Sequence, residues 1–174
     1  MKLLRTLFGI GPDPREALAP LYGSIIAEAR RPAWYADMGV PDTLDGRFDM
    51  IALILALVLV RIEAEGETGR ESGARLTELF IDDMDGQLRE IGIGDVVVGK
   101  HIGKMMAAMG GRLSAYRDNF EDDVALEEAL LRNLWRGEPV PEARPASVAA
   151  RMRAIAARLQ ATRWEDLRAH GLSA

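Results

Sequence analysis

The chain of 174 residues has no cysteine, and its two histidines are His101 and His170. A disulfide bond and a thiolate metal site are therefore excluded, and a structural zinc site is not expected. Alternating strand patterns joined by hairpin turns are missing, and no serine stands in a nucleophile-elbow pattern. We therefore expect no catalytic residues, no metal ligands and no bound cofactor.

The chain also lacks an excess of positive charge, with 22 lysines and arginines against 27 aspartates and glutamates. The formal net charge is −5, with 10 acids and 3 arginines from Glu63 to Asp95, and 6 arginines and 3 acids from Val140 onward. Binding to a DNA duplex needs a dense basic field, so we predict no DNA partner. The uneven distribution indicates solvated helix faces of different charge.

Long apolar runs are limited to "MIALILALVLV", Met50–Val60. As a helix this run would be about 16 Å long, against about 30 Å for the hydrocarbon core of a bilayer, so it does not span. A buried strand is an alternative by propensity. The leucines and alanines and the charged continuation "RIEAE" favour a central helix surrounded by others.

Apolar residues recur at helical spacing along most of the remaining chain. The pattern predicts a helix that begins at Asp13, one with a stripe from Leu76 to Ile91, one from Ile102 to Tyr116, one from Glu121 to Arg136, and one from Val148 to Leu159 before a short helical tail. We therefore predict an all-α fold, with residues 13–174 forming a single domain of about six helices packed around Met50–Val60.

Three segments break the helical periodicity. Arg30–Gly46 is predicted to be a loop, in which Trp34 and Tyr35 either anchor to the core, the favoured alternative, or form an exposed contact. "GETGRESG", Gly66–Gly73, is predicted to separate two helices. Residues 1–12 end too soon in glycine and proline for a signal peptide, and are predicted to be a mobile segment or a weak membrane-surface anchor.

The stretch "GIGDVVVGK" matches the spacing of a phosphate-binding loop from Gly94 to Lys100. Such a loop needs a buried strand before it and Ser or Thr after the lysine, whereas here a helix precedes it and His101 follows. We interpret the glycines structurally: Gly92 as a helix C′ residue, Gly94 as a tight bend, and Gly99 as a point of close backbone approach.

Two charged residues of this region also have structural interpretations. Asp95 is a candidate helix cap, and Lys100 is expected on the solvent side. A calcium loop around Gly86 is excluded, because its first and twelfth positions, Ile81 and Gly92, carry no carboxylate.

Three separated stretches resemble motifs of one protein family. Its central motif, an acidic stretch followed by "LRE-G-GD---GK", is similar to "LFIDDMDGQLREIGIGDVVVGKHIGKM", Leu79–Met105. "DTLDGRFDM", Asp42–Met50, resembles the entry into the apolar helix, and "LEEALLRNLWRG", Leu126–Gly137, resembles a later helix. By these motifs, in order from about Pro32 to Gly137, the chain is identified as a member of the ubiquinol–cytochrome c chaperone family. One departure is Gly110, where the family pattern has an aromatic before "GR".

This resemblance implies an all-helical, non-enzymatic assembly factor for the respiratory ubiquinol–cytochrome c reductase (bc) complex. Its implied partner is newly made cytochrome b, with a small partner protein or the ribosome as further partners. The lack of an evident targeting presequence fits a bacterial cytoplasmic protein, with peripheral contact at the inner membrane. The alternatives are a membrane-associated adaptor and a helical haem-carrying protein, with His101 and Met105 as spaced ligands.

The central motif is the candidate partner-binding surface, because it concentrates charge and glycine on a bend between helices. The alternative is that its glycines only shape the turn. The candidate residues are Asp82, Asp83, Asp85, Arg89, Gly92, Gly94, Asp95, Gly99 and Lys100.

Overall fold

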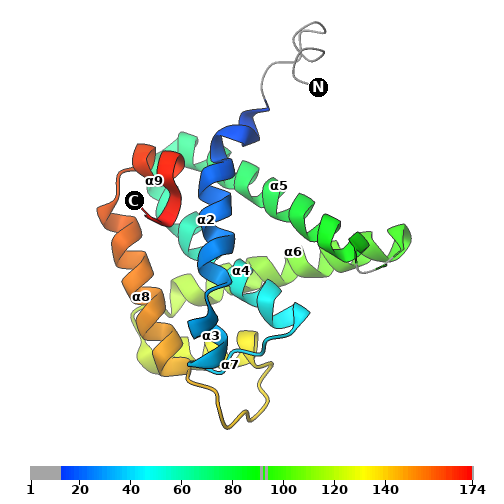
Figure 1. Cartoon of the computed structure of the whole chain (residues 1–174). Helices are drawn as coiled ribbons and strands as arrows, with labels where there is room; N and C mark the ends of the chain where they lie inside the picture. Colours follow the sequence, from blue (N-terminus) through cyan, green and yellow to red (C-terminus); the bar gives the residue numbers. More distant parts are fainter. Residues whose placement is uncertain (1–12, 91, 93, 174) are drawn as a thin grey trace, which may run out of the picture.

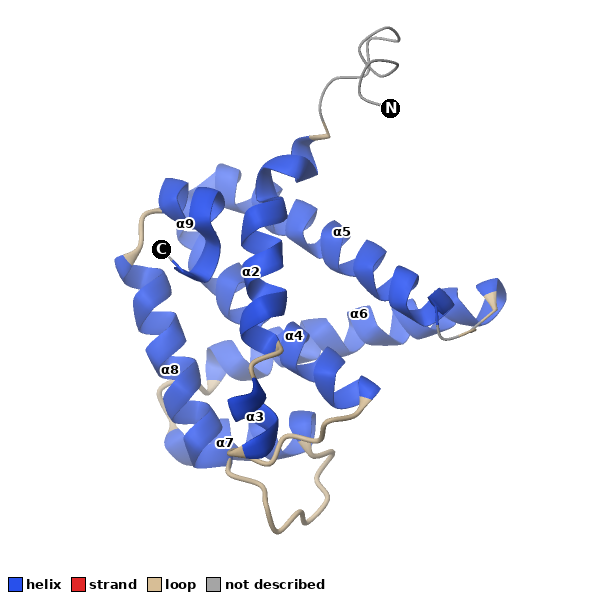
Figure 2. Cartoon of the chain, viewed as in Figure 1, coloured by secondary structure: helices blue, strands red, loops and turns tan. Residues whose placement is uncertain are grey.

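The structure is a computed structural model that describes residues 13–90, 92 and 94–173. This part of the chain forms helices joined by turns and loops, with no strand among the described residues (Figure 2). The elements are η1 (Pro14–Leu18), α2 (Ala19–Ala29), α3 (Pro32–Ala36), α4 (Leu44–Ile62), η2 (Glu63–Glu65), α5 (Gly66–Glu90), α6 (Asp95–Asp118), α7 (Asp123–Leu134), α8 (Pro145–Ala161), α9 (Trp164–His170) and η3 (Gly171–Ser173). Six of them, α2 and α4–α8, are α-helices of eleven residues or more, which confirms the predicted all-α fold.

Helix α4 is the centre of the bundle, as predicted. Every residue from Met50 to Val58 is buried, and α2, α5, α6, α7 and α8 all pack against this helix. A helix that is apolar all round needs neighbours on every side, and this requirement explains the arrangement. Within the described residues, no helix combines the length and hydropathy needed to cross a bilayer.

Helices α5 and α6 form an arm of the molecule. They are the two longest helices, and their connected ends, near Glu90 and Asp95, lie together at one edge, away from α8 and α9 (Figure 1). The predicted stripe on α5 is buried at Leu76, Phe80, Met84 and Leu88, whereas its last member, Ile91, lies outside the described residues.

The predicted separator Gly66–Gly73 is wrong, because α5 already begins at Gly66. Gly66 has φ +62° and turns the chain after η2. A Cβ at Gly69 would stand 1.9 Å from the carbonyl oxygen of Ile62, so glycine there lets α5 pass close to the end of α4. These glycines permit a turn and a close contact between helices rather than a loop.

The predicted loop Arg30–Gly46 is also partly helical, since it contains α3 and the start of α4. The two aromatic residues do anchor it. Trp34 is fully buried and its Nε1 donates to the Glu28 carbonyl at 2.8 Å, while the half-buried Tyr35 donates its hydroxyl to the Ala29 carbonyl at 2.8 Å. Burial of the Trp34 ring stabilises the helical conformation of this segment, which the spacing of its apolar residues did not indicate.

The remaining helix ends differ slightly from the predictions. The N-terminal helix begins as the 3-10 helix η1, capped by Asp13, which accepts from the Arg15 N–H at 2.9 Å. Helix α7 begins and ends about two residues inside the predicted Glu121–Arg136, with Asp122 as its N-cap. The prediction for residues 1–12 lies outside the described residues.

Candidate functional site

The predicted contact residues lie along the arm. Four are on the last turns of α5, two are in the connection, and three are on the first turns of α6 (Figure 1). In chain order they are Asp82, Asp83, Asp85 and Arg89, then Gly92 and Gly94, then Asp95, Gly99 and Lys100. The structure therefore spreads them along the arm, from the contact of α5 with the N-terminal helices to the start of α6.

Two of the acids hold the N-terminal helices against α5. Asp82 accepts from Arg15 Nη1 at 2.7 Å, and Asp83 accepts from the Tyr22 hydroxyl at 2.8 Å and from Gln87 Nε2 at 3.0 Å. Burial raises the pKa of Tyr22 and the hydrogen bond to Asp83 raises it further, so this phenol stays a donor. Both carboxylates therefore link α5 to the N-terminal helices, Asp83 at a partly buried position and Asp82 at the surface.

Asp85 and Arg89, four positions apart on α5, form an ion pair with Nε and Oδ2 2.6 Å apart. Gly92 has φ +85° and donates its N–H to the Arg89 carbonyl at 3.0 Å, as expected of a residue that ends a helix. Lys100 is exposed, also as predicted.

Two structural interpretations of this segment are wrong. In the part of the chain that the structure describes, nothing lies within 4 Å of where a Cβ of Gly99 would stand, so no described backbone passes close to it. The N-cap of α6 is Gly94 rather than Asp95, because Asp95 is already the first helical residue. The side chains of Asp95 and His101 lie outside the described residues, and with them the predicted haem ligand.

A groove of about 400 Å³ separates the arm from the start of α4. Its walls come from α4, α5 and α6, with one lining residue from the turn after α7, and its lining combines apolar with charged side chains. The lining residues are Leu44, Asp45, Phe48, Asp49, Met84, Gln87, Leu88, Lys104, Met105, Ala108, Arg112 and Arg136. We call this feature the α4–α6 groove.

The groove contains a buried ion pair. Arg112 Nη2 donates to Asp49 Oδ1 at 2.5 Å, and the two side chains are 8% and 1% exposed. Arg136 approaches from the end of α7, 3.3 Å from Asp49 and 3.2 Å from Asp45. Burial raises the pKa of Asp49, against the lowering effect of Arg112 and Arg136. The carboxylate therefore depends on these arginines to remain charged.

Aromatic rings complete this side of the groove. The Arg112 guanidinium lies 5.5 Å from the centroid of the Phe48 ring, which is 5.6 Å from that of Phe80. The sequence analysis missed the pair of Asp49 and Arg112. The available signals were an acid at the start of an apolar run and an arginine after two glycines, but nothing in the sequence joins them.

Comparison with known proteins identifies the family. A profile of the ubiquinol-cytochrome C chaperone family matches residues 36–174. The chain belongs to this family. Among solved structures, the crystal structure of the Cbp3 homolog from Brucella abortus is similar, with a TM-score of 0.78 and 30% identity over 97% of this chain and 92% of that chain. No individually curated protein sequence matches.

The family match extends past Gly137, further than the motifs indicated, and includes α8 and α9. Gly110, where the chain departs from the ubiquinol–cytochrome c chaperone pattern, is exposed, and a Cβ there would meet nothing within 4 Å among the described residues.

The motifs that carry the resemblance to this chaperone family meet at the α4–α6 groove. Asp42–Met50 supplies its α4 side, Leu79–Met105 supplies α5 and the first half of its α6 side, and Leu126–Gly137 supplies Arg136. Of the lining residues, Ala108 and Arg112 alone lie outside these three stretches, and both belong to the neighbouring segment around Gly110.

Proposed function

We propose that this chain is a non-enzymatic chaperone that binds newly made cytochrome b through the α4–α6 groove and so supports assembly of the bc complex. The observation that carries the proposal is the meeting of the three family motifs at one groove. The described side chains that line this groove form ion pairs and packing contacts. Contacts of this kind suit the binding of a polypeptide.

The lining suits an apolar polypeptide segment. Leu44 lines the groove and is 48% exposed, so its side chain is accessible to an apolar partner. Met105 is only partly buried and its unbranched side chain can adapt to different partners, as methionines do on binding surfaces that accept varied sequences, while the buried Met84 packs beneath the groove. The charged rim of Asp45, Lys104 and Arg136 would orient the bound segment.

The predicted contact residues on the arm extend this surface. Gln87 and Leu88 line the groove and are neighbours of Arg89, while Lys104 lies one turn along α6 from Lys100. We propose that the exposed arm residues, Asp85 and Lys100 among them, bind the client next to the groove. A small partner protein and the ribosome stay predictions.

The test is site-specific photo-crosslinking from position 44, followed by identification of the captured protein. Val124 on α7 is a matched control, because it is also a large exposed apolar residue, at 70%, but does not line the groove. We expect capture of cytochrome b from position 44 and not from position 124.

A second measurement uses the substitutions Leu44→Asp and Val124→Asp in cells. The first should reduce the haem b absorbance of the assembled bc complex, since a charge in the groove opposes apolar binding, and the second should not. Circular dichroism checks that both variants are folded. Equal effects at the two positions would refute the groove as the binding site.

A further inference from the structure

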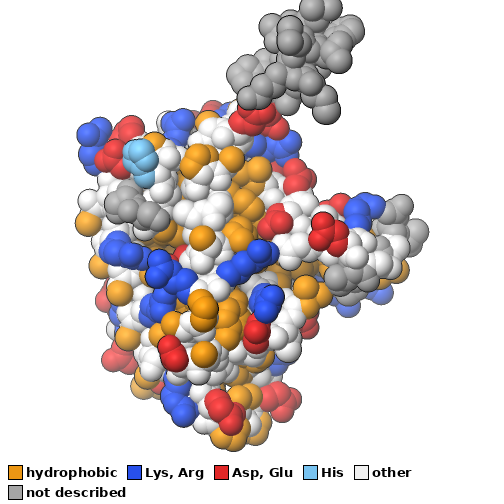
Figure 3. Space-filling model, viewed as in Figure 1, with side chains coloured by type: hydrophobic (Ala, Val, Ile, Leu, Met, Phe, Trp, Pro, Cys, Tyr) orange, Lys and Arg blue, Asp and Glu red, His pale blue; other side chains and the backbone are white. Residues whose placement is uncertain are grey.

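A band of arginines crosses another face of the molecule. Figure 3 shows Lys and Arg side chains gathered over α8 and the turn between α2 and α3. Two hollows each include one residue of this turn, and their linings identify the arginines. One is lined by Arg30 and Arg47, and the other by Arg31, Arg151 and Arg158. We call these five residues the arginine band.

Buried groups hold part of the band in place. Glu28 is 5% exposed and pairs with Arg31 Nε at 2.6 Å and with Arg151 Nη2 at 2.9 Å. The Arg151 guanidinium also lies 4.4 Å from the centroid of the buried Trp34 ring. These two cations are therefore fixed at the surface by the core beneath them.

Other charges of the band are available to a partner. Among the described residues, no hydrogen bond or ion pair engages the guanidinium of Arg30 or of Arg158. The two hollows together contain five arginines against the carboxylates of Glu28 and Asp42, a local charge of +3 on a chain whose net charge is −5. Such a local excess of charge orients a protein toward an anionic surface.

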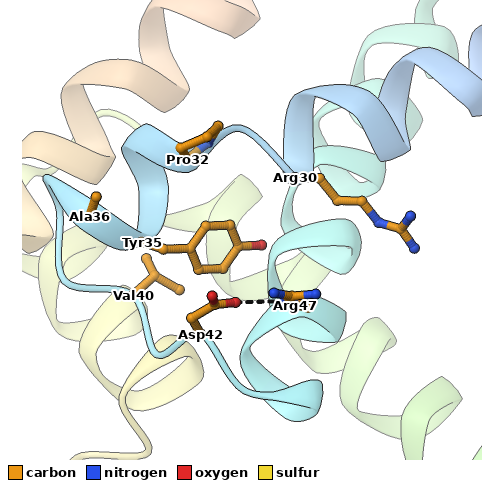
Figure 4. Close-up of a pocket in the computed structure, with 7 residues that line it drawn as sticks. All are labelled: Arg30, Pro32, Tyr35, Ala36, Val40, Asp42 and Arg47. Carbon is orange, nitrogen blue, oxygen red and sulfur yellow. Dashed lines mark hydrogen bonds and ion pairs between the residues drawn. The ribbon is translucent and has the colours of Figure 1, made fainter.

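Apolar groups stand among these cations. The hollow of about 520 Å³ between Arg30 and Arg47 also exposes Pro32, Tyr35 and Ala36, and the Tyr35 hydroxyl points to the side where the two arginines stand (Figure 4). Guanidinium groups reach lipid phosphates while aliphatic and aromatic groups enter the headgroup region. A nucleic acid would need a denser basic field than a local +3.

We propose that the arginine band binds an anionic lipid surface. The choice of lipid rests on the proposed function, because a chaperone for a subunit of a membrane complex must deliver its client to a bilayer. Each arginine near an anionic membrane contributes about 1 kcal/mol, so neutralising the two unpaired arginines should weaken binding about 30-fold.

The test is co-sedimentation of the full chain with vesicles of phosphatidylglycerol or of phosphatidylcholine. We expect binding to the anionic vesicles alone, weakened by salt. The variant Arg30→Gln/Arg158→Gln should bind about 30-fold more weakly. The control Arg75→Gln/Arg132→Gln removes the same charge from α5 and α7, outside the band, and should bind within about twofold of the wild type.

Three results would overturn the proposal. One is equal binding to both kinds of vesicle, and another is equal weakening by the two double variants. The third is tighter binding to single-stranded RNA than to anionic vesicles. Residues 1–10 also carry basic side chains and are a second candidate for lipid binding. Binding that survives their deletion and still needs Arg30 and Arg158 supports the arginine band. Because vesicle binding needs no client, it can fail while crosslinking from position 44 succeeds.

Discussion

The substitution Arg112→Leu should destabilise the fold strongly, because it leaves the Asp49 carboxylate buried without its main partner. The pair is 2.5 Å apart and its members are 8% and 1% exposed. Arg136 stays 3.3 Å away but is 56% exposed, so it compensates little. Removing one member of a buried pair costs about 4 kcal/mol, and loss of the contact with Phe48 adds to it.

The pH dependence of this loss is a specific test. Because burial raises the pKa of Asp49 above its ordinary 3.8, the folded chain binds this proton more readily than the unfolded chain does. The contribution of Asp49 to stability therefore falls as pH rises from 3.8 through the folded pKa. Arg112 lowers that pKa, so the variant should titrate at higher pH and should lose more stability at about pH 8 than at about pH 5.

Urea denaturation followed by circular dichroism measures the free energy of unfolding at each pH, and thermal denaturation gives the melting temperature. A loss of about 4 kcal/mol corresponds to a fall of roughly 12 °C in melting temperature for a domain of this size. The double variant Asp49→Leu/Arg112→Leu should recover most of the stability, because neither charge then needs a partner. A single variant within about 1 kcal/mol of the wild type at both pH values would refute the importance of the buried pair.

Three further substitutions test the packing of α5. Gly69→Ala should cost about 2 kcal/mol in urea denaturation, because the new Cβ would stand 1.9 Å from the Ile62 carbonyl oxygen, whereas Gly86→Ala, on the same helix in open space, should stabilise by about 0.5 kcal/mol. Tyr22→Phe should cost about 1 kcal/mol, since it leaves Asp83 without the 2.8 Å hydrogen bond. Similar effects at the two glycines, or none at Tyr22, would contradict these assignments.

Local patterns predicted what depends on local structure. The uninterrupted apolar run from Met50 to Val60 specified a central helix, because such a surface has to be covered on every side. The pair of Asp85 and Arg89 followed from helical geometry. The C′ position of Gly92 followed from the known preference of glycine for positive φ.

Features that depend on tertiary approach could not be predicted. The sequence does not show which glycine lies against another helix. A Cβ at Gly69 would meet the end of α4, whereas a Cβ at Gly99 would meet no described atom within 4 Å. Asp49 and Arg112 are 63 positions apart and are brought together only by the packing of α6 on α4. The predicted surface was therefore placed on the arm, whereas the groove beside it could be found only from the packed helices.

The end of α7 shows how the third family motif contributes to the groove without forming a wall of its own. Trp135 donates its Nε1 to the Gly39 carbonyl at 2.6 Å, which ties the end of α7 to the segment before α4. Arg136 has φ +57°, a left-handed conformation that costs a non-glycine residue about 1–2 kcal/mol. That conformation directs its guanidinium to Asp45 and Asp49 at the start of α4. The position of Arg136 in the groove therefore depends on α4 and α7 remaining docked.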